Sequence, residues 1–323
     1  MEAAAEGRED RIGALPDELL QHIMSFLLSR DAVRTCVLAR RWRTLWKSVP
    51  ALRICDPESY DGATGSSTFV DDLLRLRDPT PLTVCHVTST NSYDEDCDSD
   101  WAEEAFERME PWLQYAVSCQ VQVLNFPLRV TNMNLISSHL KRMPSLVTAS
   151  IRLGHMCADY CYCSNLACEG CRRDASESDY SIVLHGLSGA SNLKLVIFLP
   201  ALFVFRKDLK WHPVFSKLKT LWLNEWCVVD DFKGLIYFLQ HSPILETLTI
   251  ELQYRPHEKQ LVFKTDESYN PREQPLLLKH LKLVTILCQT EEDVEVPCIL
   301  KILSAHGVPS KQIVIKTTSM RWN

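Results

Sequence analysis

The amino-acid sequence predicts an α/β solenoid preceded by a short module of three helices, so that the chain as a whole is α+β. Two observations predict the solenoid: an apolar strand pattern, L-x-x-L-x-L, recurs along the chain, and helical patterns fill the intervals between its copies. Each short strand leaves apolar side chains that only neighbouring units can cover, so such units stack. The third observation is a helical period of apolar residues between positions 15 and 49, which predicts the module.

Composition bounds the class of protein. The chain has 323 residues, of which 46% are hydrophobic and 24% charged, and its formal net charge of −6 gives no general reason to expect nucleic-acid binding. Its opening, MEAAAEGRED, is acidic and polar where a signal peptide is basic and then apolar. The longest apolar run, residues 195–205, contains Pro200 and is shorter than the roughly 20 residues of a membrane helix. We expect an intracellular protein of the nucleus or the cytoplasm, with no membrane partner.

The N-terminal module has apolar residues at a helical period in three runs, residues 19–27, 33–37 and 38–46, and each run predicts a short helix. Pro16 suits the first turn of the first helix, and Asp31 is placed to cap the second. Helices this short are marginal alone, and a module below about 40 residues rarely sustains a core of its own. We therefore expect these apolar side chains to dock against another polypeptide.

Two segments of the module, LPDELLQHIMSFL and AVRTCVLARRWRTLW, resemble the F-box, through which the substrate receptors of Skp–cullin–F-box ubiquitin ligases bind their adaptor. The Leu-Pro start, the Asp-Glu-Leu-Leu step, the Ile and Phe-Leu steps and the Arg-Trp…Leu-Trp ending occur in order. The resemblance implies an F-box over residues 8–54 that binds a Skp-type adaptor and, through it, cullin. Ten residues would interlock with the adaptor: Leu15, Pro16, Leu19, Leu20, Ile23, Phe26, Val33, Val37, Trp42 and Trp46. The alternative is that they form only the chain's own core.

Basic residues in the same module leave a second interpretation open. Residues 30–53 contain seven Lys and Arg residues against one acid, Asp31, as in a small helical DNA-binding regulator. Trp42, Leu45 and Trp46, however, interrupt the polar face that a recognition helix needs to read bases. A basic rim facing an acidic adaptor explains the same charges. We therefore expect no nucleic-acid partner.

The repeated strand pattern has five good copies and one weaker copy. The good copies are Val121/Leu124/Phe126, Leu193/Val196/Phe198, Leu218/Leu221/Leu223, Leu245/Leu248/Ile250 and Leu278/Leu281/Leu283, and the weaker one is Leu146/Ala149/Ile151. Successive starts lie 25, 47, 25, 27 and 33 residues apart, which is close to the leucine-rich-repeat period of about 20 to 29 residues except for the second and last gaps. Between copies, DDFKGLIYFLQHSP predicts a helix that ends before Pro243. Leucine-rich sequence can also produce such copies by chance.

Set after an F-box, this arrangement resembles the plant F-box proteins with leucine-rich repeats, as do the phrases FSKLKTLWLNEWCVVDDF and LQHSPILETLTIEL. We assign an irregular repeat body to residues 55–275. The Asn or Cys that usually follows the strand is absent, because Trp226 occupies its place after Leu223. Residues 276–323 are similar to the FBD region that ends many of these proteins: a strand, an acidic turn, a helix ending at Gly307 and a strand over residues 312–315.

Target binding is predicted at the strand positions between the last two apolar residues of each copy, which should face the concave side of a solenoid. These positions are Asn125, Ser150, Ile197, Trp222, Thr249 and Lys282. Trp222 is the preferred anchor for an unknown protein target, because exposed aromatic residues often dominate interfaces. A tryptophan packed into its own fold is the alternative reading.

The chain's thirteen cysteines include a cluster in an acidic loop near residues 155–180. Cys161, Cys163, Cys168 and Cys171 are a weak zinc candidate, since only the last pair has ordinary ligand spacing, and a loop of reduced thiols is the alternative. No Walker loop, H-E-x-x-H or G-x-S-x-G elbow occurs. We therefore expect no cofactor and no catalysis, and we interpret the chain as a substrate receptor, with a DNA-binding regulator or a non-ligase repeat scaffold as alternatives.

Overall fold

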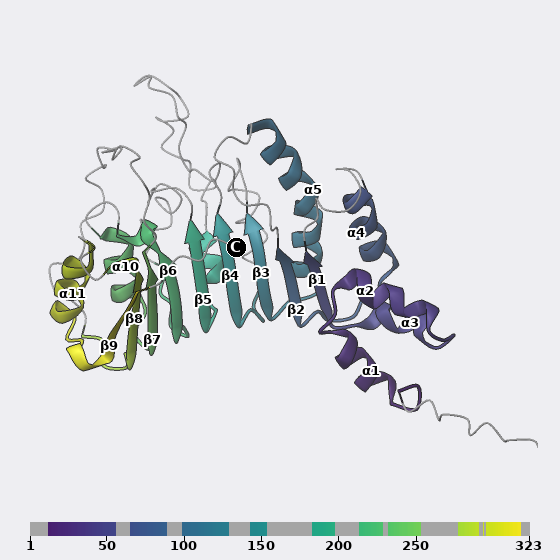
Figure 1. The fold of residues 1–323 in the computed structure, drawn as a ribbon, viewed down its shortest axis with the longest axis horizontal. Helices are drawn as coiled ribbons and strands as arrows, with labels where there is room; N and C mark the ends of the chain where they lie inside the picture. The colour runs from purple at the N-terminus through teal and green to yellow at the C-terminus, as the bar shows by residue number, and fades with distance from the viewer. Residues whose placement is uncertain are drawn as a thin grey trace, which may run out of the picture. The chain divides into compact units, whose positions relative to one another are not determined.

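The computed structural model describes residues 12–55, 65–88, 99–128, 143–153, 183–197, 213–228, 232–252, 277–290, 293 and 295–317 (Figure 1). The chain divides into two compact units, Met1–Thr90 and Asn91–Asn323, and each is described by itself. Nine strands lie in the described part of the chain, and every strand pairing that is described is parallel.

The first unit begins with the predicted helical module. Its elements are α1 (Asp17–Met24), α2 (Ser29–Arg34), the 3-10 turn η1 (Thr35–Val37), α3 (Trp42–Leu45), the 3-10 turn η2 (Trp46–Ser48), β1 (Ala51–Cys55), α4 (Gly65–Leu76) and β2 (Val84–Thr88). The three predicted helices are confirmed. The prediction that Asp31 caps the second helix is wrong, because α2 begins two residues earlier and Asp31 pairs instead with Arg34 inside it, at 3.3 Å.

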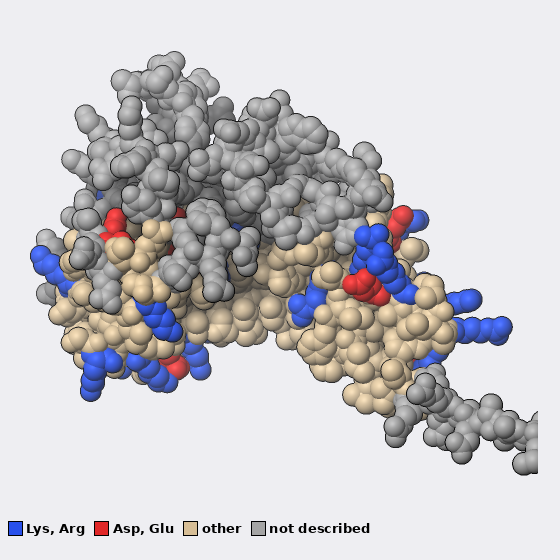
Figure 2. Space-filling view, viewed as in Figure 1, with Lys and Arg blue, Asp and Glu red and all other residues tan. Residues whose placement is uncertain are grey.

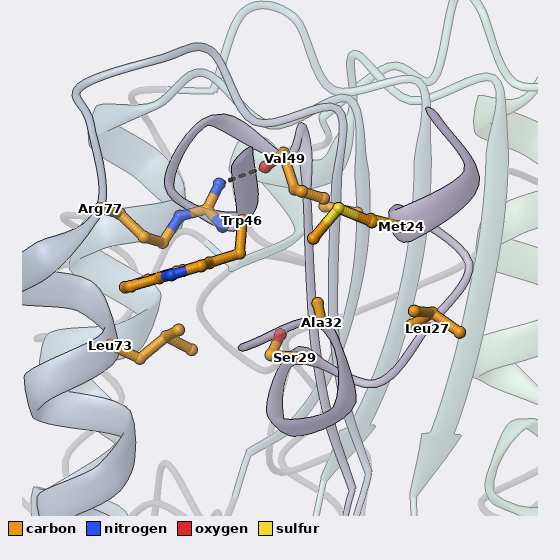
Figure 3. Close-up of a pocket in the computed structure, with 9 residues that line it drawn as sticks. Met24, Leu27, Ser29, Ala32, Trp46, Val49, Leu73 and Arg77 are labelled. Atoms are coloured by element: carbon orange, nitrogen blue, oxygen red, sulfur yellow. Dashed lines mark hydrogen bonds between the residues drawn. The ribbon is translucent and has the colours of Figure 1, made fainter. Parts of the chain in front are cut away.

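The module's core is completed by β1 and α4, neither of which the sequence analysis predicted. Leu73 and Arg77, at the end of α4, face Trp46 in Figure 3. The buried guanidinium of Arg77 donates a hydrogen bond to the carbonyl of Val49, just before β1. Ser48 donates to the carboxylate of Asp78, at 2.6 Å. These contacts fasten α4 to the end of the module, so the helices do not close their core alone.

The second unit alternates strands with helices. Its elements are α5 (Ser99–Ser118), β3 (Val123–Leu128), β4 (Thr148–Leu153), α8 (Val183–Leu187), β5 (Asn192–Ile197), β6 (Thr220–Asn224), the 3-10 turn η4 (Glu225–Cys227), α10 (Lys233–His241), β7 (Thr247–Glu251), β8 (Leu283–Cys288), α11 (Glu295–Ala305), the 3-10 turn η5 (Ser310–Gln312) and β9 (Ile313–Thr317). Strands β3 to β9 pair in chain order, side by side (Figure 1). Parallel neighbours joined through helices or long connections are typical of a leucine-rich-repeat solenoid, which confirms the predicted fold class.

Burial tests each copy of the strand pattern. The copies that begin at Val121, Leu146, Leu218 and Leu245 have all three apolar residues buried. Two copies were read in the wrong register. The buried triplets there are Ala190/Leu193/Leu195 and Leu281/Val284/Ile286. In the first unit, Val49/Leu52/Ile54 and Leu82/Cys85/Val87 follow the same pattern and are buried, although the sequence analysis did not find them.

Trp226 occupies the position where the repeat usually has Asn or Cys, and its side chain bonds to the backbone of a neighbouring repeat. It is buried, and its indole Nε1 donates to the carbonyl of Leu195 in the preceding repeat, at 3.4 Å. The buried amide of Asn224 also bonds to this repeat, since its Oδ1 accepts from the backbone N–H of Ile197 and its Nδ2 donates to that residue's carbonyl, both at 2.8 Å. Together they satisfy backbone groups that would otherwise be buried without partners.

The predicted strand, helix and final strand of the C-terminal region occur in that order, and most of the predicted acidic turn lies outside the described residues. Strand β8 is followed by α11, which ends at Ala305, and Gly307 has φ of 78° just before the chain turns into β9. Glycine suits this left-handed conformation because it has no Cβ to clash. In the described ranges, no helix has both the length and the apolar character needed to span a membrane.

Candidate functional site: an exposed apolar helical surface and a row of strand residues

The N-terminal module exposes a group of large apolar side chains, which we call the helical surface. Its members are Leu19, Ile23, Phe26, Leu27, Leu28, Val37 and Leu38. Val37 is 82% exposed and Phe26 is 67% exposed. Figure 2 shows the region of α1 to α3 as a mainly uncharged surface with Lys and Arg side chains projecting from its margin. Contiguous exposed apolar residues of this kind mark interaction surfaces.

The ten residues predicted to contact an adaptor divide into three groups. Leu19, Ile23, Phe26 and Val37 belong to the helical surface, Pro16 is exposed, and Leu15 and Val33 are half-buried. The remaining three, Leu20, Trp42 and Trp46, are buried in the core of the first unit. Adjacent positions on a helix point about 100° apart, so Leu19 can face outward while Leu20 is fully buried.

Leu27, Leu28 and Leu38 were missed by the sequence analysis as surface residues. Leu27 and Leu28 lie in the connection between α1 and α2, and Leu38 follows η1. The sequence signal for their exposure was their position at the ends of short helices. There the amphipathic period no longer determines which way a side chain points. Their exposure extends the helical surface from α1 to η1.

Several basic side chains of the module make internal contacts. Arg41 pairs with Asp17 and donates to the carbonyl of Gly13 at 2.6 Å. Arg53 donates from Nε to the carbonyl of Ser25, at 2.8 Å. Because Arg53 lies on β1 and Ser25 follows α1, this bond helps to hold the helical surface in place.

A second candidate site follows the strands of the second unit. The register aligns one residue from each strand, and we call this set the outer row: Asn125, Ser150, Lys194, Trp222, Thr249, Thr285 and Val314. On β3 to β8 its members alternate with buried apolar residues, and on β9 Val314 lies between the half-buried Ile313 and Ile315. All are half-buried except Val314, which is exposed. Side chains from distant parts of the sequence therefore lie next to one another in this row.

Trp222 has defined partners within this site. Its indole Nε1 donates to Oε2 of Glu251 on β7, at 3.0 Å, and the ammonium of Lys194 on β5 lies 3.7 Å from the centroid of its ring. The pKa of Lys194 is lowered by burial and, to a lesser degree, by the positive charge of Arg152, against the opposing effect of Glu251. Such a cation–π contact favours one orientation of the lysine.

Comparison with known proteins identifies the module. Residues 12–53 match the F-box domain, and this range contains the whole helical surface. The chain therefore contains an F-box domain.

The chain is similar to several proteins of Arabidopsis thaliana. It is 49% identical over 69 residues to an FBD-associated F-box protein, covering 21% of this chain and 15% of the relative. It is 36% identical over 122 residues to an F-box/FBD/LRR-repeat protein, covering 38% and 25% respectively. To an F-box/LRR-repeat protein it is 29% identical over 154 residues, covering 46% and 38%. The resemblance to plant F-box proteins with leucine-rich repeats is confirmed, over less than half of the chain.

Two of the six residues predicted to bind a target lie outside the outer row. Ile197 is buried with the core, and Lys194 takes its place opposite Trp222. Lys282 lies just before β8, where it pairs with Glu246 at 2.5 Å, and Thr285 takes its place opposite Thr249. The other four, Asn125, Ser150, Trp222 and Thr249, lie in the outer row.

The predicted zinc candidate lies outside the described residues, as does the whole cysteine-rich loop from 155 to 180. Within the described ranges, no group of His, Cys, Asp and Glu residues is arranged to hold a metal ion.

Proposed function

We propose that this chain is a substrate receptor of a Skp–cullin–F-box ubiquitin ligase. Its helical surface binds a Skp-type adaptor inside the cell, and its outer row holds a target protein. The observation that carries the proposal is the helical surface itself: seven large apolar side chains stay exposed within a segment that matches the F-box domain. Burying them against a partner would release water from apolar surface, which favours association.

The mechanism proposed is proximity. A receptor that holds adaptor and target together converts ubiquitin transfer from a collision between separate proteins into a step at high effective concentration. The catalytic groups then belong to other subunits, and this chain needs only two binding surfaces.

The adaptor proposal is tested by co-purification. The chain is co-expressed with a tagged Skp-type adaptor, and recovery is compared for wild type, Val37→Asp and Val214→Asp. Val37 is 82% exposed on the helical surface, and Val214 is 55% exposed before β6, so both variants add one charge at an exposed valine. We expect Val37→Asp to abolish recovery and Val214→Asp to preserve it. Equal recovery of all three proteins contradicts the proposal.

The alternative of a DNA-binding regulator is less well supported, because Arg41 and Arg53 are already engaged with the module's own backbone. Titration of a mixed-sequence DNA duplex at several salt concentrations distinguishes the two. Binding that weakens steeply with salt, together with loss of adaptor recovery, would favour the regulator.

A further inference from the structure

The second unit brings four side chains together from four consecutive strands, and we call them the charged cluster: Arg152 on β4, Lys194 on β5, Trp222 on β6 and Glu251 on β7. They come from positions 152 to 251, so no local sequence pattern groups them. The indole of Trp222 links two members, because it donates to Glu251 and carries Lys194 over its ring.

The electrostatics of the charged cluster are unbalanced. It contains two cations, Arg152 and Lys194, and one carboxylate, that of Glu251. Burial is the largest cause that lowers the pKa of Lys194; Glu251 opposes it, and the positive charge of Arg152 adds a smaller lowering effect. Partial burial weakens screening by water, so the repulsion between the two cations is larger than at a fully exposed surface. A second carboxylate at this place would be attracted by both cations and would relieve their repulsion.

We propose that Arg152 and Lys194 bind a carboxylate side chain of an extended acidic segment in the target protein, with Trp222 holding Lys194 in place. This inference rests on the proposed function, since it names the chemistry of the target that the outer row receives. Charge complementarity selects an Asp or Glu side chain over a neutral one. The neighbouring outer-row residues Ser150 and Thr249 carry hydroxyl groups, which can bond to the backbone of an extended peptide.

Preorganisation supports the role of Trp222. A lysine side chain has several rotatable bonds, and it loses their conformational entropy when it is fixed against a ligand. Here the contact with the indole ring, at 3.7 Å, already restricts the Lys194 ammonium, and the bond to Glu251 fixes the ring. Less entropy is therefore lost when a carboxylate binds. Trp222 acts as a positioning residue in this site rather than as a direct ligand.

The test uses the full chain in complex with its Skp-type adaptor and three fluorescent 12-residue peptides. They alternate serine with aspartate, asparagine or phosphoserine, and fluorescence anisotropy gives their Kd values. We expect the aspartate peptide to bind at least about tenfold more tightly than the asparagine peptide. Arg152→Met and Lys194→Met should each weaken its binding by about tenfold. Trp222→Leu should weaken it less, and added salt should weaken it in wild type.

The matched control is Lys219→Met, which removes one positive charge at an exposed position next to Glu246, away from the charged cluster. It should leave the Kd of the aspartate peptide unchanged. The proposal is wrong if Lys219→Met weakens binding as much as Lys194→Met does, if the asparagine peptide binds as well, or if no peptide binds wild type. Binding of only the phosphoserine peptide would overturn the carboxylate assignment. Recovery of the adaptor by the Arg152 and Lys194 variants tests the receptor function separately.

Discussion

Leu19 and Leu20 are adjacent residues of the same type that face opposite environments, and truncating each to alanine gives opposite outcomes. Leu20 is fully buried, so Leu20→Ala should lower the free energy of unfolding by about 2–5 kcal/mol. Leu19 is 48% exposed, so about half of the roughly 1.5–3 kcal/mol of a full leucine burial remains available to a partner. Leu19→Ala should therefore cost about 1 kcal/mol in adaptor binding, or about a fivefold increase in Kd.

Two measurements separate these effects. Urea denaturation gives the free energy of unfolding of each variant, and isothermal titration with the purified Skp-type adaptor gives the Kd. Phe26→Ala is a second surface variant with a larger expected effect, because 67% of its residue surface is exposed. The reasoning is refuted if Leu19→Ala and Phe26→Ala both bind the adaptor as wild type does, or if Leu20→Ala is as stable as wild type.

Three further predictions concern the packing of the second unit. Trp226→Phe keeps an aromatic ring but loses the hydrogen bond to the carbonyl of Leu195, so urea denaturation should show a free energy of unfolding lower by about 1–3 kcal/mol. An unchanged denaturation midpoint would contradict the role given to the indole. Gly234→Ala places a Cβ 2.8 Å from Trp226 Cζ3 and 3.2 Å from the Cα of Cys227, which is too close for either contact to stay unchanged. Thermal denaturation should therefore show a lower Tm, although alanine favours helix more than glycine does. A higher Tm would show that Trp226 moves freely. Burial raises the pKa of Cys227, so iodoacetamide should label the exposed Cys298 long before it labels Cys227. Mass spectrometry of the native chain measures both labelling rates. Equal rates would mean that the core around Cys227 opens readily.

The fold class was predictable because the same strand pattern recurs and helical patterns separate its copies. The predicted assignment of inward-facing residues was wrong in two strands where apolar residues run continuously. In LKLVIF, apolar residues occupy both faces of the strand, and the reading placed Val196 inward where Leu195 is buried. In LKLV, Leu283 was taken as inward, but it is 40% exposed and Val284 is buried. A slip of one residue reverses every side chain of a strand, so Ile197 was placed on the wrong face.

The helical surface was only partly predictable for a different reason. The helices α1 and α2 have only eight and six residues, about two turns each, so the apolar period alone does not say which face is buried. Burial is decided by β1 and α4, which contribute Leu52, Leu73 and Arg77 to the core of the first unit. Since the sequence analysis did not predict these elements, it could not separate Leu20 from Leu19. Similarly, only the register of β4 to β7 brings the charged cluster together.

The parallel register of β3 to β9 sets a scale for whatever crosses the outer row. Neighbouring strands lie about 4.8 Å apart, whereas an extended peptide advances about 3.3 Å per residue. The distance across two strand steps therefore matches the length of about three residues of an extended ligand. A target lying across β4 and β6 would span them with about three residues, so inserting a single residue between two recognised side chains should weaken recognition, because it changes their separation and reverses the direction of the second side chain.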